Sequence, residues 1–141
     1  MGLDNHILLR TRKQIDKDNF EEWPEYISIE HDDFWDNEYK DGYYYSICYW
    51  RKCWGLRDAI LSLLEIDNSG GGEFTIDTPN QINGVIKAIE FFLENPYEWK
   101  SQVWTIDEMA HILAKDIINL SWLKQFMNEH KDTKVIFIDS F

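Results

Sequence analysis

Apolar residues recur every three or four positions in three stretches of the chain, a pattern that predicts three helices. The expected helices span residues 51–65, 79–94 and 106–130. Thr78 and Thr105 stand just before the last two helices as N-caps. Gln81 and Glu108 follow three residues later, so each can complete a capping box with its threonine.

Shorter β-prone runs lie around these helices, at residues 6–12, 43–49, 73–77, 101–104 and 135–138. The last run is continuously apolar, which is typical of a central strand rather than an edge strand. Between Asp16 and Gly42 we expect a long loop with one short element around Tyr26–Ile29, because the Trp23-Pro24 step disfavours helix there.

Strands at both ends of the chain with helices between them predict an α+β fold, in which one small sheet is covered by about three helices. The chain has 141 residues, 44% of them hydrophobic, so it can bury a core without disulfides or metal. Neither a repeat nor a long linker divides it. We therefore expect a single domain, residues 1–141, with no bound cofactor.

Negative charge is concentrated in one part of the chain. The formal net charge is −12, and the segment from Asp16 to Asp41 holds eleven acidic residues against two lysines. A chain this acidic is repelled by phosphate backbones, so we do not expect it to bind duplex nucleic acid.

The compartment is inferred from the cysteines and from the hydropathy. Cys48 and Cys53 are five residues apart, which fits neither a zinc site nor a redox motif, so we expect two reduced, partly buried thiols. No apolar run reaches the length of a membrane span, and the first residues lack the basic start of a signal peptide. These features favour a cytoplasmic protein with no membrane partner.

The most informative segment is Tyr49-Trp50-Arg51-Lys52, where two aromatic residues precede two cations at a predicted strand-to-helix junction. Trp54 and Arg57 follow at helical spacing from Arg51. Cations beside aromatic rings recognise bases, phosphates and carboxylates, and helix-start amides favour anions. Alternatively, Tyr49 and Trp50 belong to the core, and the cations pair with the acidic segment or with Asp4.

Two tetrapeptides give the chain a resemblance to a known group of proteins. Met1-Gly2-Leu3-Asp4 at the start and Tyr49-Trp50-Arg51-Lys52 before an apolar helix are similar to an uncharacterised family of phage and prophage-borne bacterial proteins. The resemblance implies a related fold and source, but no reaction. This chain has Trp54 and Arg57 where the family has Asn and His.

Other chemical motifs are weaker. Glu108 and His111 match one Glu-x-x-His of a di-iron bundle, but capping explains Glu108 and no second copy exists. His31-Asp32-Asp33 reads as a solvated turn rather than a cation site. No serine or cysteine lies in a recognisable nucleophile motif, so we rank an enzyme last. A site in which Asp4, His6 and Arg51 meet in space would strengthen that hypothesis.

These observations lead to two main hypotheses of different classes. The first is a small binding module that sequesters an anionic, nucleotide-like metabolite, with Asp4, Tyr49, Trp50, Arg51, Lys52, Trp54 and Arg57 contributing to the site. The second is an acidic inhibitor that imitates nucleic acid and binds a host DNA-binding or defence protein, with Trp23, Phe34 and Trp35 as anchors.

The start of the chain carries one further expectation. We expect residues 2–4 to be ordered and packed near Arg51, because a strand begins almost at residue 1 and Asp4 needs a cationic partner if it is partly buried.

Overall fold

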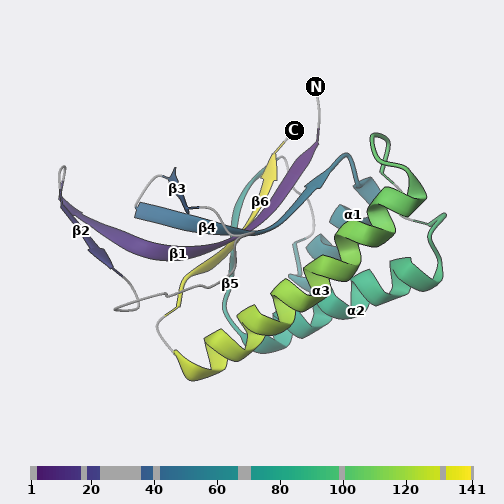
Figure 1. Cartoon of the computed structure of the whole chain (residues 1–141). Helices are drawn as coiled ribbons and strands as arrows, with labels where there is room; N and C mark the ends of the chain where they lie inside the picture. Colours follow the sequence, from purple (N-terminus) through teal and green to yellow (C-terminus); the bar gives the residue numbers. More distant parts are fainter. Residues whose placement is uncertain are drawn as a thin grey trace.

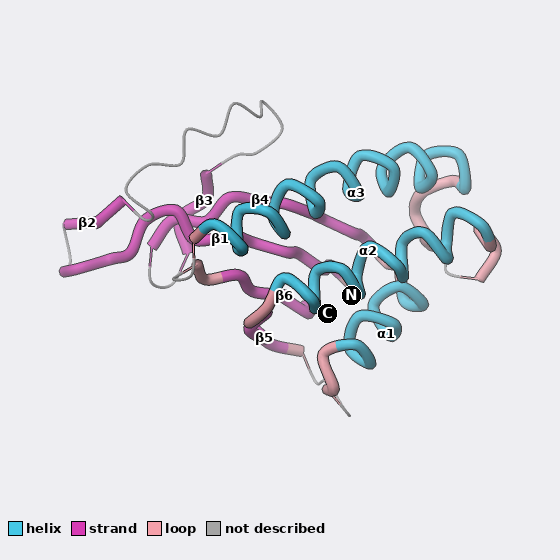
Figure 2. The backbone as a smooth tube through the Cα atoms, turned by 90° about the horizontal axis from the view of Figure 1, so that it is seen from below, coloured by secondary structure: helices cyan, strands magenta, loops and turns pink. Residues whose placement is uncertain are grey.

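The described part of the chain forms six strands and three helices, and all three helices lie on one face of the sheet (Figures 1 and 2). The computed structural model describes residues 3–16, 19–22, 36–39, 42–66, 71–98, 101–130 and 133–140. The strands are β1 (Asp4–Asp16), β2 (Asn19–Glu22), β3 (Asp36–Tyr39), β4 (Gly42–Arg51), β5 (Gly72–Ile76) and β6 (Val135–Ser140). The helices are α1 (Trp54–Leu63), α2 (Pro79–Glu94) and α3 (Ile106–Glu129). The prediction of an α+β fold with one sheet covered by three helices is confirmed.

The strands pair in antiparallel order, and the first and last described strands lie side by side inside the sheet. The order is β3-β4-β1-β6-β5, and β2 pairs with the far end of β1. β1 pairs with β6 along residues 4–9 and with β4 along residues 4–13. β6 is therefore an interior strand, as its apolar run predicted.

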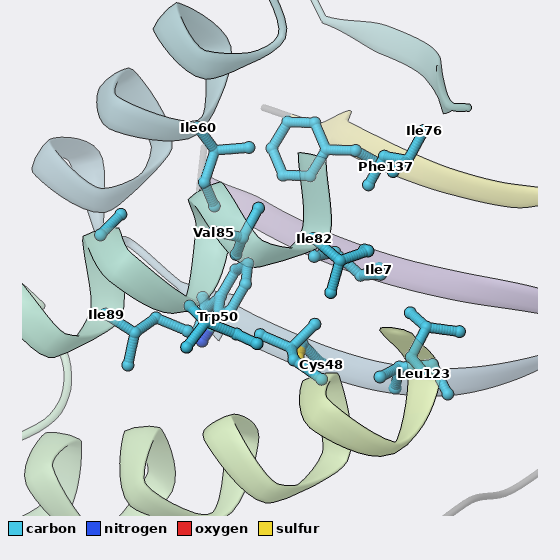
Figure 3. Packing of buried hydrophobic residues seen from close by; sticks show 14 of the residues in the cluster. Ile7, Cys48, Trp50, Ile60, Ile76, Ile82, Val85, Ile89, Leu123 and Phe137 are labelled. Atoms are coloured by element: carbon cyan, nitrogen blue, oxygen red, sulfur yellow. The ribbon is translucent and has the colours of Figure 1, made fainter. Parts of the chain in front are cut away.

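The main core fills the space between the sheet and the helices. Trp50 is its largest fully buried side chain, with 1% of its surface exposed, and an aromatic of this size removes roughly 200 Å² from water. Figure 3 shows Trp50 among aliphatic residues that come from α2 and the sheet. The labelled core residues are Ile7, Cys48, Trp50, Ile60, Ile76, Ile82, Val85, Ile89, Leu123 and Phe137.

The face of the sheet opposite the helices, here called the outer face, carries a second and smaller cluster. Leu8, Tyr44 and Ile136 are buried there, and Ile138 packs against them. Leu8 and Ile136 alternate with neighbours that belong to the main core, as the pleat of a strand requires. Both faces of β1 and β6 are thus apolar near the middle of the sheet.

Both predicted capping boxes are present. The Thr78 hydroxyl accepts a hydrogen bond from the Gln81 N–H, and the Gln81 side chain accepts one from the Thr78 N–H. Thr105 and Glu108 make the same reciprocal pair at the start of α3. These contacts satisfy amides that the first helical turn leaves without partners.

Two of the expected boundaries were wrong. The first helix begins at Trp54 rather than at residue 51, because β4 continues to Arg51 and Lys52 then turns with a φ of 54°. Residues 101–104 form a bend and not a strand. There the Ser101 hydroxyl accepts hydrogen bonds from the N–H groups of Val103 and Trp104, which closes a local turn.

The acidic segment is also more structured than expected. β2 and β3 both lie within the stretch predicted as a loop, and the predicted element around Tyr26–Ile29 falls outside the described residues. β1 runs on to Asp16 because β4 and then β2 pair with it. Backbone pairing thus extends a strand through residues of low β-propensity.

Candidate functional site

Four polar and aromatic side chains come together on the outer face, at the ends of β1 and β4. The register pairs Asp4 with Arg51 and His6 with Tyr49, directly across the two strands. Residues two apart on a strand point to the same face, so the four side chains form a square. We call these four residues the outer-face cluster.

Aromatic stacking and one hydrogen bond organise the cluster. The His6 and Tyr49 rings are stacked, with centroids 4.7 Å apart and 27° between the planes. Trp104 meets the Tyr49 ring edge-on at 6.1 Å. The Tyr49 hydroxyl donates to Asp4 Oδ1 at 2.9 Å, which fixes the phenol relative to the carboxylate.

The same surroundings favour the neutral forms of both rings. Burial lowers the pKa of His6, and the smaller opposing effect of the Asp4 charge does not reverse this. Burial, with the Asp4 hydrogen bond, raises the pKa of Tyr49. Near neutral pH the cluster therefore presents an uncharged imidazole and phenol between one carboxylate and one guanidinium.

The cations of this region keep most of their hydrogen-bonding capacity. Arg51 Nε lies 4.0 Å from Asp4 Oδ1, and the two side chains are 52% and 39% exposed. Within the described residues, the Nη atoms of Arg51 and the ammonium of Lys52 make no hydrogen bond or ion pair. An anion could therefore bind Arg51 without first displacing a strong partner.

Backbone contacts hold the end of β4 in place beneath this cluster. The Lys52 N–H donates to the Leu3 carbonyl at 2.7 Å, and the Lys52 carbonyl accepts from the Gln102 N–H at 3.1 Å. The Ser101 hydroxyl donates to the Arg51 carbonyl. The turn at Lys52 is thus tied both to the start of the chain and to the bend before α3.

The other predicted site residues lie on the opposite side of the sheet. Trp50 fills the core and donates its indole Nε1–H to Asp116 Oδ2 at 2.7 Å, so it does not face a surface ligand. Arg57 forms two hydrogen bonds with Asp139, and its guanidinium lies 5.6 Å from the Trp54 ring centroid. The predicted set therefore does not line one pocket. Asp4, Tyr49 and Arg51 share a surface, and Lys52 adjoins it.

The structure places two further residues, His6 and Trp104, beside the predicted binding residues Asp4, Tyr49 and Arg51. The sequence carried different amounts of information about the two. His6 shares the strand face of Asp4 because it is two residues later in β1, whereas the predicted strand began only at His6. Trp104 arrives through the bend after Ser101, which was expected to be a strand. Its position beside Tyr49 depends on tertiary structure.

A buried polar cluster was missed altogether. Asp116 lies on the buried side of α3, between Leu113 and Leu120, and is 6% exposed. It accepts a hydrogen bond from the Trp50 indole, and the Cys48 thiol lies nearby. An acid at a position of the apolar stripe was the available sequence signal.

The weaker motifs, Glu108 with His111 and His31-Asp32-Asp33, do not add a site to the described structure. Glu108 caps α3 and His111 is exposed on that helix. Among the described residues, no three His, Cys, Asp or Glu side chains gather as a metal site would require. His31-Asp32-Asp33 lies outside the described residues. Asp4, His6 and Arg51 do share one surface, so an acid–base role remains the third hypothesis.

Comparisons with known proteins do not narrow these possibilities. No protein-family model, curated protein or solved structure matches the chain. The similarity to phage-borne proteins remains a prediction from the two tetrapeptides. Within the described residues, none of the helices has the length and apolar character needed to cross a membrane.

Proposed function

We propose that this protein is a small binding module whose outer-face cluster, with Trp104 beside it, takes an anionic, ring-containing metabolite of the nucleotide type. One observation supports this most directly. The exposed Arg51 guanidinium, whose one ion pair with another described residue is to Asp4, lies on the same strand face as a stacked His6–Tyr49 pair. Aromatic faces and a guanidinium together match a base and a phosphate.

Each part of the cluster has a separate role in this proposal. The Nη atoms of Arg51 can donate two parallel hydrogen bonds to a phosphate or carboxylate. The exposed parts of the aromatic rings offer stacking area to a base. Asp4 Oδ1 already accepts from Tyr49, which leaves Oδ2 to accept from an amino group or a ribose hydroxyl.

The overall charge makes this local arrangement necessary. A chain with a net charge of −12 repels anions at long range, so a bound anion must be held by short-range contacts. We therefore expect affinity to depend strongly on Arg51. If the chain shares the source of the phage-borne proteins that it resembles, sequestration of a host signal nucleotide is a use that suits such a module.

Calorimetry with a panel of mono-, di- and cyclic nucleotides tests the proposal. Arg51→Ala should weaken binding roughly tenfold to a hundredfold, because a charge-assisted contact contributes about 1.5–3 kcal/mol. Lys87→Ala is the matched control, since it removes an exposed cation from α2, on the helical side of the sheet. Binding of no nucleotide, or equal losses in both variants, contradicts the proposal.

A second candidate function is supported by the position of the acidic strands. The β1–β2 hairpin extends beyond the helices (Figures 1 and 2), and β2 and β3 carry Glu21, Glu22, Asp36 and Glu38 at that end of the sheet. A projection rich in acidic residues suits a protein that occupies the DNA-binding surface of a host protein. The proposed anchors Trp23, Phe34 and Trp35 lie outside the described residues.

The second candidate needs a test that separates charge from fold. The protein and its Glu21→Gln/Glu22→Gln variant should be used as baits in host lysate at low and high salt, with identification of what each retains. A DNA-binding protein that is released by salt, lost in the variant and displaced by DNA supports mimicry. A partner that the variant retains equally, or no partner at either salt, contradicts it.

A further inference from the structure

Asp116 is a carboxyl group inside the main core, and among the described residues no cation forms a hydrogen bond with it. It lies near the middle of α3 and points toward the sheet, where Trp50 Nε1–H donates to Oδ2 at 2.7 Å. The Cys48 thiol is close enough to the same carboxyl to influence its pKa. Buried carboxylates are normally paired with a cation, so this arrangement is unusual.

The carboxyl is part of the contact between α3 and β4. Asn119 lies one turn after Asp116 on the same side of the helix, and its Nδ2 donates to the Ile47 carbonyl at 3.4 Å. Ile47 sits where the β1–β4 register shifts. Asn119 therefore contacts β4 at its irregular part, and Asp116 contacts it at Trp50, between the outer-face cluster residues Tyr49 and Arg51.

The groups around the carboxyl come from several elements. β4 contributes Cys48, and Cys53 approaches from the segment before α1. Lys115 on α3 is the cation whose charge acts on Asp116, and its effect is weaker than that of burial. α2 contributes apolar side chains such as Val85 and Ile89, which surround Trp50 in Figure 3.

We propose that Asp116 is a proton-sensitive anchor: its neutral carboxyl lets α3 sit firmly on β4, and its ionisation loosens that contact. A charge confined between Trp50 and Cys48 must recover hydration, and the direct way is for α3 to move away from the strand. This inference goes beyond the proposed function and does not depend on whether the outer face binds a ligand.

The Asp116 carboxyl should change its protonation state near physiological pH. Burial raises the pKa of Asp116 to about 7, although the Trp50 hydrogen bond and the nearby Cys48 thiol oppose the shift. A folded-state pKa above the unfolded value means that the folded protein holds the proton more tightly. Its contribution to stability is therefore complete at low pH and is lost as the pH rises through about 7.

Equilibrium unfolding between pH 5 and pH 9 tests the inference with the intact chain. The unfolding constant of the wild type should rise by up to roughly tenfold per pH unit below pH 7 and level off above it. Asp116→Asn keeps an oxygen for the indole N–H and cannot ionise, so it should lack this rise. Glu90→Gln, the same change on an exposed face of α2, should behave like the wild type.

Two measurements on the folded state keep the test decisive if Asp116→Asn folds poorly. Carbon NMR of the wild type should show the Asp116 carboxyl titrating near pH 7. Hydrogen exchange of the Trp50 indole should accelerate above that pH by more than base catalysis alone predicts, as judged from the exposed Trp54 indole. A carboxyl that titrates below pH 5, parallel unfolding profiles for wild type and Asp116→Asn, or exchange with no excess acceleration would overturn the proposal.

Discussion

Asp139 and Arg57 form a bidentate ion pair between the last strand and the first helix. Arg57 Nε donates to Asp139 Oδ1 and Nη2 donates to Oδ2, each at 2.9 Å, and the carboxylate is fully buried. The Asn5 amide adds a third hydrogen bond to Oδ1, also at 2.9 Å. The pair joins α1 to the two central strands. It also raises the pKa of Arg57, which keeps the guanidinium charged.

Removal of one partner of this pair should destabilise the fold strongly. Arg57→Ala removes two hydrogen bonds and a positive charge from the buried Asp139 carboxylate, and we expect a loss of about 3–5 kcal/mol in the free energy of unfolding. Urea denaturation measures it. Asp58→Ala is the matched control, because it removes a second carboxylate that contacts Arg57, one that is 68% exposed. Its cost should stay below about 1 kcal/mol. Equal costs for the two variants would contradict the assignment.

The start of the described chain should be held by an apolar residue and not by its ion pair. Of the residues expected near Arg51, Gly2 lies outside the described residues and Asp4 lies beside Arg51. The pair is exposed, so Asp4→Ala should cost less than about 1 kcal/mol. Leu3 is fully buried and its carbonyl accepts from Lys52 N–H, so Leu3→Ala should cost about 2–4 kcal/mol. Thermal unfolding of both variants measures the two losses of stability. A larger loss for Asp4→Ala than for Leu3→Ala would contradict the prediction.

Both thiols should be inert in the folded protein. Burial raises the pKa of Cys53 to about 11, and burial with the nearby Asp116 charge raises the pKa of Cys48. At pH 8 a thiol with such a pKa is ionised in roughly one molecule in a thousand, and the thiolate is the reactive form. Ellman's reagent should therefore react at least about a hundredfold more slowly with native protein than with protein in urea. Equal rates in the two states would show that the thiols are accessible.

The elements that could be predicted from the sequence are those whose signals are local. Helical spacing and the two capping boxes identified α2 and α3, and the apolar run of β6 indicated an interior strand. β2 and β3 have no alternating pattern, and they exist as strands because β1 and β4 pair with them. Contacts between residues far apart along the chain also depend on tertiary structure and could not be predicted. Arg57 and Asp139, for example, are separated by 82 residues.

The candidate site was only partly predictable because one strand boundary was misplaced. Because the predicted strand ended at Tyr49, Trp50 was assigned to a junction. The aromatic and basic residues of that junction were therefore predicted to share one surface. β4 continues to Arg51, so consecutive residues point to opposite faces. The two alternatives considered for Tyr49 and Trp50 thus apply to different residues: Trp50 is core and Tyr49 faces outward.

This division gives a sharp test on two adjacent aromatic residues. Trp50→Phe removes the indole donor of a buried carboxyl and leaves space in the core, so we expect a loss of about 2–4 kcal/mol in the free energy of unfolding at pH 7. Tyr49→Phe removes one hydrogen bond to the partly exposed Asp4 and keeps the ring stacked on His6, so its cost should stay below about 1 kcal/mol.

On the outer face we expect the reverse order: Tyr49→Phe should change the titration of His6, and Trp50→Phe should not. Without its hydroxyl, residue 49 no longer orients the Asp4 carboxylate. The stacking of its ring on the His6 imidazole is unchanged. NMR titration of the His6 ring should therefore change in Tyr49→Phe, where the freed Asp4 carboxylate can move toward the imidazole and raise its pKa. The titration should stay as in the wild type in Trp50→Phe, because that side chain lies across the sheet. A His6 titration that shifts in Trp50→Phe and not in Tyr49→Phe would mean that the two faces of β4 are assigned the wrong way round.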